Sequence, residues 1–116
     1  MKPETLDLFK KANYRQTQKN QLQLLKELKA ERLTIGHNGG LFDINPTLLN
    51  LVSLLENKKY SKAVIDDRNG NPIEIDVKLF MKLILDTYIQ EQNYYLAEHN
   101  KIVTARSVEE ILTYDD

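Results

Sequence analysis

Cysteine is absent from this 116-residue sequence, and so is any long apolar run. Without cysteine the chain has no disulfide bond, no zinc–thiolate site and no cysteine nucleophile. The start, Met-Lys-Pro-Glu-Thr, lacks the apolar segment of a signal peptide, and no run approaches the roughly 18 apolar residues that span a membrane. We therefore expect a soluble protein that is made in a reducing cytoplasm and has no membrane contact.

The chain also carries almost no net charge. The formal charge is −1, which is no overall signature of nucleic-acid binding. Residues 1–32 carry eight Lys/Arg and four Asp/Glu, whereas the remainder carries eight and thirteen, so a basic start precedes an acidic remainder. The basic residues of this start are interleaved with Glu and Asp, and its only aromatic residues are Phe9 and Tyr14. Nucleic acid is therefore not favoured as a partner.

The middle of the chain predicts a β-hairpin at residues 63–75, followed by a helix at 77–99. Asn69-Gly70 is typical of a two-residue type I′ turn, since both residues tolerate positive φ. Asp76 can cap the helix through its carboxylate. Val64, Ile65, Ile73 and Ile75 of the hairpin are expected to pack against the helix and the leucines of 48–55. The buried face of the helix is expected to contain Val77, Phe80, Met81, Ile84, Tyr88 and Tyr95.

The first third predicts a long helix over residues 3–33. Its start has a small apolar face with Leu6 and Phe9, and a polar stretch then precedes an apolar seam at Leu22, Leu25 and Leu28. This seam covers two heptads at most, which is a weak coiled-coil signal. Two interpretations stay open, namely an arm that reaches another subunit and an ordinary surface helix.

Two further helices and a tight reversal complete the pattern. Residues 36–40, which include three glycines, mark either a second small hairpin or a loop over the core. Asn45 and Pro46 suit the N-cap and first position of a helix, and the dense leucines after them predict that this helix is buried. Residues 107–110, Ser-Val-Glu-Glu, match a capping box that opens a short helix through Leu112.

No residue pattern carries a recognisable chemistry. The glycines of 36–40 lack the Lys-Ser/Thr of a P-loop, and residues 66–71 do not fit the spacing of a calcium loop. His37 and His99 are far apart and have no spaced carboxylate partner, which makes a poor metal site. The hairpin carboxylates suit capping or solvent better than acid–base work; they are Asp66, Asp67, Glu74 and Asp76. We expect no enzyme, no cofactor and no metal, and rank last an enzyme that uses residues 36–40 with His37 and Asp43.

Residues 63–112 resemble a known group of proteins. A short hydrophobic strand and an Asp/Asn-Gly turn precede Pro-Ile-Glu-Ile, a long helix with an alternating Tyr/Glu/Asn end and a closing Ala-Arg-Ser-Val-Glu-Glu-Ile-Leu. This order is similar to the small accessory or tail-assembly proteins of tailed bacteriophages. The resemblance covers under half of the chain and assigns a role to no residue. It implies a virion component or assembly factor in the host cytoplasm during assembly or in the virion itself.

The sequence thus predicts a small, helix-dominated α+β fold. Residues 1–33 are expected to form a helical arm, and 34–116 a compact domain with one or two β-hairpins and a long central helix. The expected function is that of a non-catalytic phage virion component or assembly factor that binds copies of itself or other virion proteins. The alternative is a small regulatory protein that binds a host or phage factor, or nucleic acid, through the basic helix.

The expected interface lies on the two long helices. Tyr88 and Tyr95 are seven residues apart and share a helix face, which fits core packing and a tyrosine-rich subunit interface equally well. The seam of the first helix is the other expected contact surface. The candidate interface residues are Phe9, Leu22, Leu25, Leu28, Tyr88 and Tyr95.

Overall fold

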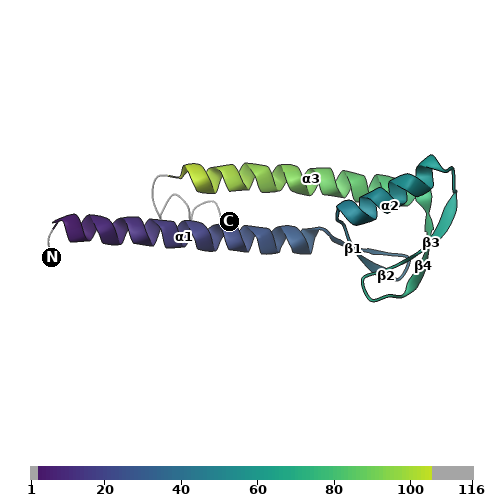
Figure 1. Cartoon of the computed structure of the whole chain (residues 1–116), viewed down its shortest axis with the longest axis horizontal. Helices are drawn as coiled ribbons and strands as arrows, with labels where there is room; N and C mark the ends of the chain where they lie inside the picture. The colour runs from purple at the N-terminus through teal and green to yellow at the C-terminus, as the bar shows by residue number, and fades with distance from the viewer. Residues whose placement is uncertain (1–2, 106–116) are drawn as a thin grey trace. The chain divides into compact units, whose positions relative to one another are not determined.

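The computed structural model describes residues 3–105, which form three helices and two short antiparallel hairpins (Figure 1). The elements are α1 (Pro3–Arg32), β1 (Thr34–His37), β2 (Gly40–Asp43), α2 (Pro46–Asn57), β3 (Lys62–Asp66), β4 (Pro72–Asp76) and α3 (Val77–Thr104). The predicted helix-dominated α+β fold is confirmed. α3 continues to Thr104 rather than ending at residue 99. The predicted capping box at 107–110 and its short helix lie outside the described residues.

The chain divides into two compact units. Residues 29–92 form the hairpin unit, and the described residues of 1–28 and 93–116 form the helix-pair unit. This division differs from the expected arm at 1–33 and domain at 34–116. The reason is that Leu25 of α1 packs against Ile102 and Ala105, so α1 has a partner within its own chain.

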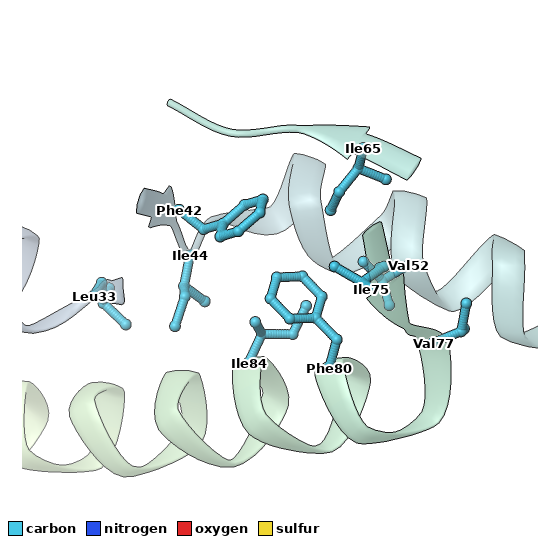
Figure 2. Close-up of a cluster of buried hydrophobic side chains, with 9 residues drawn as sticks. All are labelled: Leu33, Phe42, Ile44, Val52, Ile65, Ile75, Val77, Phe80 and Ile84. Atoms are coloured by element: carbon cyan, nitrogen blue, oxygen red, sulfur yellow. The ribbon is translucent and has the colours of Figure 1, made fainter. Parts of the chain in front are cut away.

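Nine buried apolar side chains form the core of the hairpin unit (Figure 2). Phe80 lies among them, with its ring 5.0 Å from the rings of both Phe42 and His37. Burying a side chain of this size stabilises a fold by about 1.5–3 kcal/mol. The members of the core are Leu33, Phe42, Ile44, Val52, Ile65, Ile75, Val77, Phe80 and Ile84.

The predicted packing of the second hairpin is confirmed on one face only. Ile65 and Ile75 are buried against Phe80, and Ile73 is half-buried. Val64 was expected in the core, but its side chain is 64% exposed. Successive residues of a strand point to opposite faces, and the face that carries Val64 has no covering layer among the described residues.

The first hairpin, β1–β2, turns at Asn38 and Gly39. Both residues have positive φ, at 49° and 84°, as a type I′ turn requires. His37 pairs with Gly40 across this turn. Of the two interpretations of residues 36–40, the small hairpin is therefore the correct one.

The second hairpin, β3–β4, has a five-residue loop at 67–71 instead of the predicted two-residue turn. Asp66 pairs with Pro72, and within the loop only Gly70 has a positive φ, at 79°. The side chain of Asp67 explains the difference, because one of its oxygens accepts hydrogen bonds from the amides of Asn69 and Asn71, each 2.9 Å long. A carboxylate that gathers nearby amides stabilises a wider loop than the sequence Asn-Gly alone predicts.

The helix caps are as predicted. Asn45 accepts a 2.8 Å hydrogen bond from the amide of Leu48, with Pro46 in the first turn of α2. Asp76 accepts one from the amide of Leu79 at the start of α3.

The predicted burial of α2 is wrong. Only Val52 is fully buried in this helix, whereas Leu51 and Leu54 are 43% and 56% exposed. One face of α2 covers the core, and the leucines on the opposite face extend into solvent.

Candidate functional site

The helix-pair unit consists of residues 3–28 of α1 and the antiparallel end of α3 from residue 93 (Figure 1). Leu25, Ile102 and Ala105 form its buried centre, and Tyr95 packs against them. The hydroxyl of Tyr14 donates a 2.5 Å hydrogen bond to the carbonyl oxygen of Ala105. These contacts fix how the two helices face each other.

A groove of 290 Å³ lies between the two helices of this unit. Its apolar walls come from α1, through Leu24, Leu25 and Leu28, and from α3, through Tyr94 and Ile102. The groove therefore offers a mainly apolar surface to an occupant.

The polar groups of the groove are Gln21 and Glu98. Gln21 is 93% buried, and its side-chain oxygen Oε1 has no hydrogen-bond partner among the described residues. Glu98 forms a 3.0 Å ion pair with Lys101. Because an unmet buried acceptor costs free energy, Gln21 favours an occupant that brings a hydrogen-bond donor.

The structure separates the six candidate interface residues by burial. On α1, Phe9 and Leu28 are exposed, at 59% and 38%, whereas Leu25 is 8% exposed and packs inside the helix pair. Leu22 is half-buried against the same cluster. Leu25 thus serves contacts within the chain, and Phe9 and Leu28 are accessible to a partner.

The two candidate tyrosines of α3 pack in different hydrophobic clusters. Tyr88 is half-buried and packs against the core of the hairpin unit. Tyr95 is half-buried in the helix pair, 5.8 Å from the ring of His99. Of the two open interpretations, core packing accounts for the buried part of each side chain.

Several exposed apolar residues lie outside the six candidate interface residues. On α1 they include Leu6 and Leu24, which are 45% and 53% exposed. On α3, Leu96 and Val103 are 58% and 39% exposed. The spacing of Tyr14, Gln21 and Leu25, at seven and four residues, marks the side of α1 that faces α3 and could have separated Leu25 from Leu24.

One side of α1 is basic. Residues 8–26 include five Lys/Arg and no Asp/Glu, so the basic residues are not interleaved with acids as the sequence reasoning supposed. At 100° per residue, four of them fall within one quadrant of the helix. None of the four forms an ion pair with a residue of 3–105; they are Lys11, Arg15, Lys19 and Lys26.

The carboxylates of the hairpins hold structural positions. Asp43 accepts hydrogen bonds from Arg68, which also donates to Thr34. The bonded guanidinium of Arg68 lowers the pKa of Asp43. Asp76 caps α3, and Glu74 lies 3.8 Å from Lys62. Each of these carboxylates has a local partner that explains its position.

Asp67 connects the two hairpins. Besides its loop bonds, its second carboxylate oxygen accepts a 3.1 Å hydrogen bond from the amide of Leu41 in β2. The amide of Arg68 donates to the carbonyl oxygen of Leu41 at 2.7 Å. Hydrogen bonds from the amides of Asn71, Leu41 and Asn69 lower the pKa of Asp67. A carboxylate that accepts hydrogen bonds from three backbone amides has a structural role, and here it stabilises the contact between the two hairpins.

The remaining candidate residues from the sequence also have structural roles. The ring of His37 packs against that of Phe80 at a tilt of 43°, and residues 36–40 form the turn of the first hairpin. Among residues 3–105, no group of three or more His, Cys, Asp or Glu side chains is arranged to hold a metal ion. No described helix combines the length and apolar character needed to cross a bilayer.

No family model, curated protein or solved structure matches this chain.

Proposed function

We propose that this chain is a non-catalytic protein that acts through protein–protein contacts. One observation carries the proposal. Among residues 3–105, seventeen large apolar side chains are exposed, whereas twelve apolar residues are buried. Single exposed leucines are ordinary, but more exposed than buried apolar side chains favour a surface that a partner covers.

The surface in question is best defined in the helix-pair unit. There the exposed apolar residues of α1 include two that line the groove, Leu24 and Leu28. Tyr94 adds a 39% exposed tyrosine from α3, and tyrosine is enriched where proteins bind each other. We call the exposed parts of Leu24, Leu28 and Tyr94 the groove face.

The setting that we propose is a tailed-phage particle or its assembly in the host cytoplasm. This part rests on the resemblance of residues 63–112 to phage accessory and tail-assembly proteins. Partners are then other virion proteins or further copies of the chain. An assembly protein needs accessible contact surfaces rather than a reactive centre, which agrees with the placement of the hairpin carboxylates in structural roles.

The test is site-specific cross-linking in cells that produce the chain. A photo-reactive amino acid replaces Leu24 on the groove face or, as the control, Lys19 on the basic side of the same helix. We expect adducts of defined mass from position 24 and not from position 19, with the captured protein identified by mass spectrometry. Equal labelling at the two positions, or none at position 24, would contradict the proposal.

A second candidate function is binding to nucleic acid through the basic side of α1. The observation that favours it is the quadrant shared by Lys11, Arg15, Lys19 and Lys26. Phosphate contacts release counterions, so such binding weakens steeply as salt rises. Fluorescence anisotropy with labelled duplex DNA at about 50 and 200 mM salt tests it. Binding that does not change with salt, or no binding at low salt, would remove this candidate.

A further inference from the structure

We infer that the groove of the helix pair is filled by the N-terminal part of α1 from a second copy of this chain. The same contact forms in reverse, so that two copies pair through antiparallel α1 helices. This inference rests on the proposed function, because it names the partner of the groove face. It is carried by the charge pattern of α1, by its exposed apolar residues and by the unmet acceptor in the groove.

The two ends of α1 present matching apolar surfaces. Leu6 and Leu24 are 18 residues apart, which is five full turns, so both lie on the same side of the helix. Phe9 adds 59% exposed apolar surface beside Leu6, and Leu28 adds 38% beside Leu24. The two pairs are separated by about 27 Å along the helix axis at 1.5 Å per residue. An antiparallel second copy places each pair against the other.

On the side of α1 that carries Leu6 and Leu24, the charges at the two ends are opposite. Lys10 adjoins the Leu6 end and Glu27 adjoins the Leu24 end. Neither forms an ion pair with another residue of the described chain. Antiparallel pairing brings Lys10 of one copy to the Glu27 end of the other, twice in each dimer. Parallel pairing would bring like charges together instead, so the charges select the antiparallel arrangement.

The groove accepts what the N-terminal end of α1 provides. Its polar lining contains Oε1 of Gln21, which lacks a donor, and the carboxylate of Glu98, which already accepts a hydrogen bond from Lys101. The entering segment carries the ammonium group of Lys10 on the same side as apolar Leu6. A cationic and apolar segment therefore fits both the walls of the groove and its unmet hydrogen-bonding capacity.

The polar middle of α1 also follows from this arrangement. The centre of an antiparallel pair lies near Thr17, midway between Leu6 and Leu28, where each copy meets the same residues of the other. Polar residues at the centre of a helix interface specify its register, as buried Asn does in coiled coils. The two copies of the contact close on each other in one pair, so this contact by itself does not extend into a filament.

Charge reversal tests the inference. Sedimentation velocity over a dilution series measures the dimer dissociation constant of the full chain. Lys10→Glu or Glu27→Lys alone should weaken the dimer by about tenfold or more, because each places like charges together twice. The double variant Lys10→Glu/Glu27→Lys should return the constant towards the wild-type value. Lys19→Glu makes the same charge change on the basic side of α1 and should leave the dimer intact.

The outcomes separate this inference from the proposed function. A wild-type chain that stays monomeric, or a double variant as weak as the single ones, would overturn antiparallel self-pairing. If the position-24 probe then captures a different protein, the proposed function stands and only the identity of the partner changes. Circular dichroism of each variant shows that its helices are intact. All three substituted side chains are exposed, so we expect no loss of helix content.

Discussion

The hydroxyl of Tyr14 in α1 donates a 2.5 Å hydrogen bond to the backbone carbonyl of Ala105, 91 positions later in the sequence. The same hydroxyl accepts a 3.4 Å hydrogen bond from Gln18, one helical turn further along α1. Tyr14 therefore fixes the end of the helix pair, on which the groove between α1 and α3 depends.

We expect Tyr14→Phe to weaken the helix pair while the hairpin unit keeps its structure. The lost bond has a net worth of about 1 kcal/mol, and the carbonyl of Ala105 loses its side-chain donor. Hydrogen exchange should show faster opening of the amides at 93–105 and unchanged protection in β1–β4. Tyr60→Phe, at a 59% exposed tyrosine, is the control and should change neither.

Truncating Leu25 should destabilise the chain far more than truncating its neighbour Leu24. Leu25 is 8% exposed in the cluster with Ile102, whereas Leu24 is 53% exposed. Leu25→Ala leaves a cavity and should cost about 2–5 kcal/mol in the free energy of unfolding of the helix pair. Leu24→Ala should cost well under 1 kcal/mol by urea denaturation. Similar losses for the two variants would contradict the assigned packing of α1.

This placement changes what charge substitutions on α1 are expected to do. If the seam of Leu22, Leu25 and Leu28 were a contact surface, as the sequence predicts, Leu25→Glu/Leu28→Glu would break assembly without unfolding the chain. With Leu25 buried, this double variant should also open the helix pair, since an unpaired charge cannot stay buried at low cost. Leu24→Glu/Leu28→Glu is the cleaner test of the groove face, because both side chains are exposed.

Asp67 should make the hairpin unit sensitive to acid. Its pKa is lower in the folded chain than in the unfolded chain, so its contribution to stability is complete above the unfolded value of about 3.9. That contribution is lost as pH falls through the lower folded value. Melting curves from pH 6 down to pH 2 should show a smaller acid-induced fall for Asp67→Asn than for wild type. Asn69→Ala keeps this carboxylate and should retain the wild-type slope.

Gly40 should tolerate no side chain. A Cβ atom there would lie 2.7 Å from Cγ1 of Ile73 and 3.1 Å from Cβ of Asp67, where the two hairpins meet. Gly40→Ala must shift the side chain of Ile73 or the strand that carries it, and should cost about 1–3 kcal/mol in the free energy of unfolding. Gly36→Ala is the matched control, since the nearest atom to its Cβ would be 3.9 Å away. Equal melting temperatures for the two variants would show that the hairpins do not meet at Gly40.

Local chemistry made part of this fold predictable from sequence. Asn45 and Asp76 act on amides three residues away, so their capping could be predicted without tertiary information. The turn at Asn69-Gly70 was mispredicted, because the carboxylate of Asp67 accepts hydrogen bonds from Asn69 and Asn71 and a further one from Leu41, 26 positions away. The sequence pattern alone gave no sign of this contact.

Burial was the harder property to predict. Leu24 and Leu25 belong to the same apolar segment of α1, and only the presence of Ile102 and Ala105 separates the exposed residue from the buried one. The leucines of α2 likewise appear equivalent in sequence, although one face of that helix is left uncovered. Of the candidate interface residues on α1, the structure therefore places Leu25 inside the helix pair and leaves Phe9 and Leu28 exposed.

The mass of the full chain in solution tests the central claim most directly. Light scattering over a dilution series should give twice the 13.5 kDa chain mass at high concentration and approach 13.5 kDa on dilution. The groove-face variant Leu24→Glu/Leu28→Glu should be folded and monomeric at every concentration. A wild-type chain at 13.5 kDa throughout, or a groove-face variant that dimerises as the wild type does, would contradict self-association through this groove.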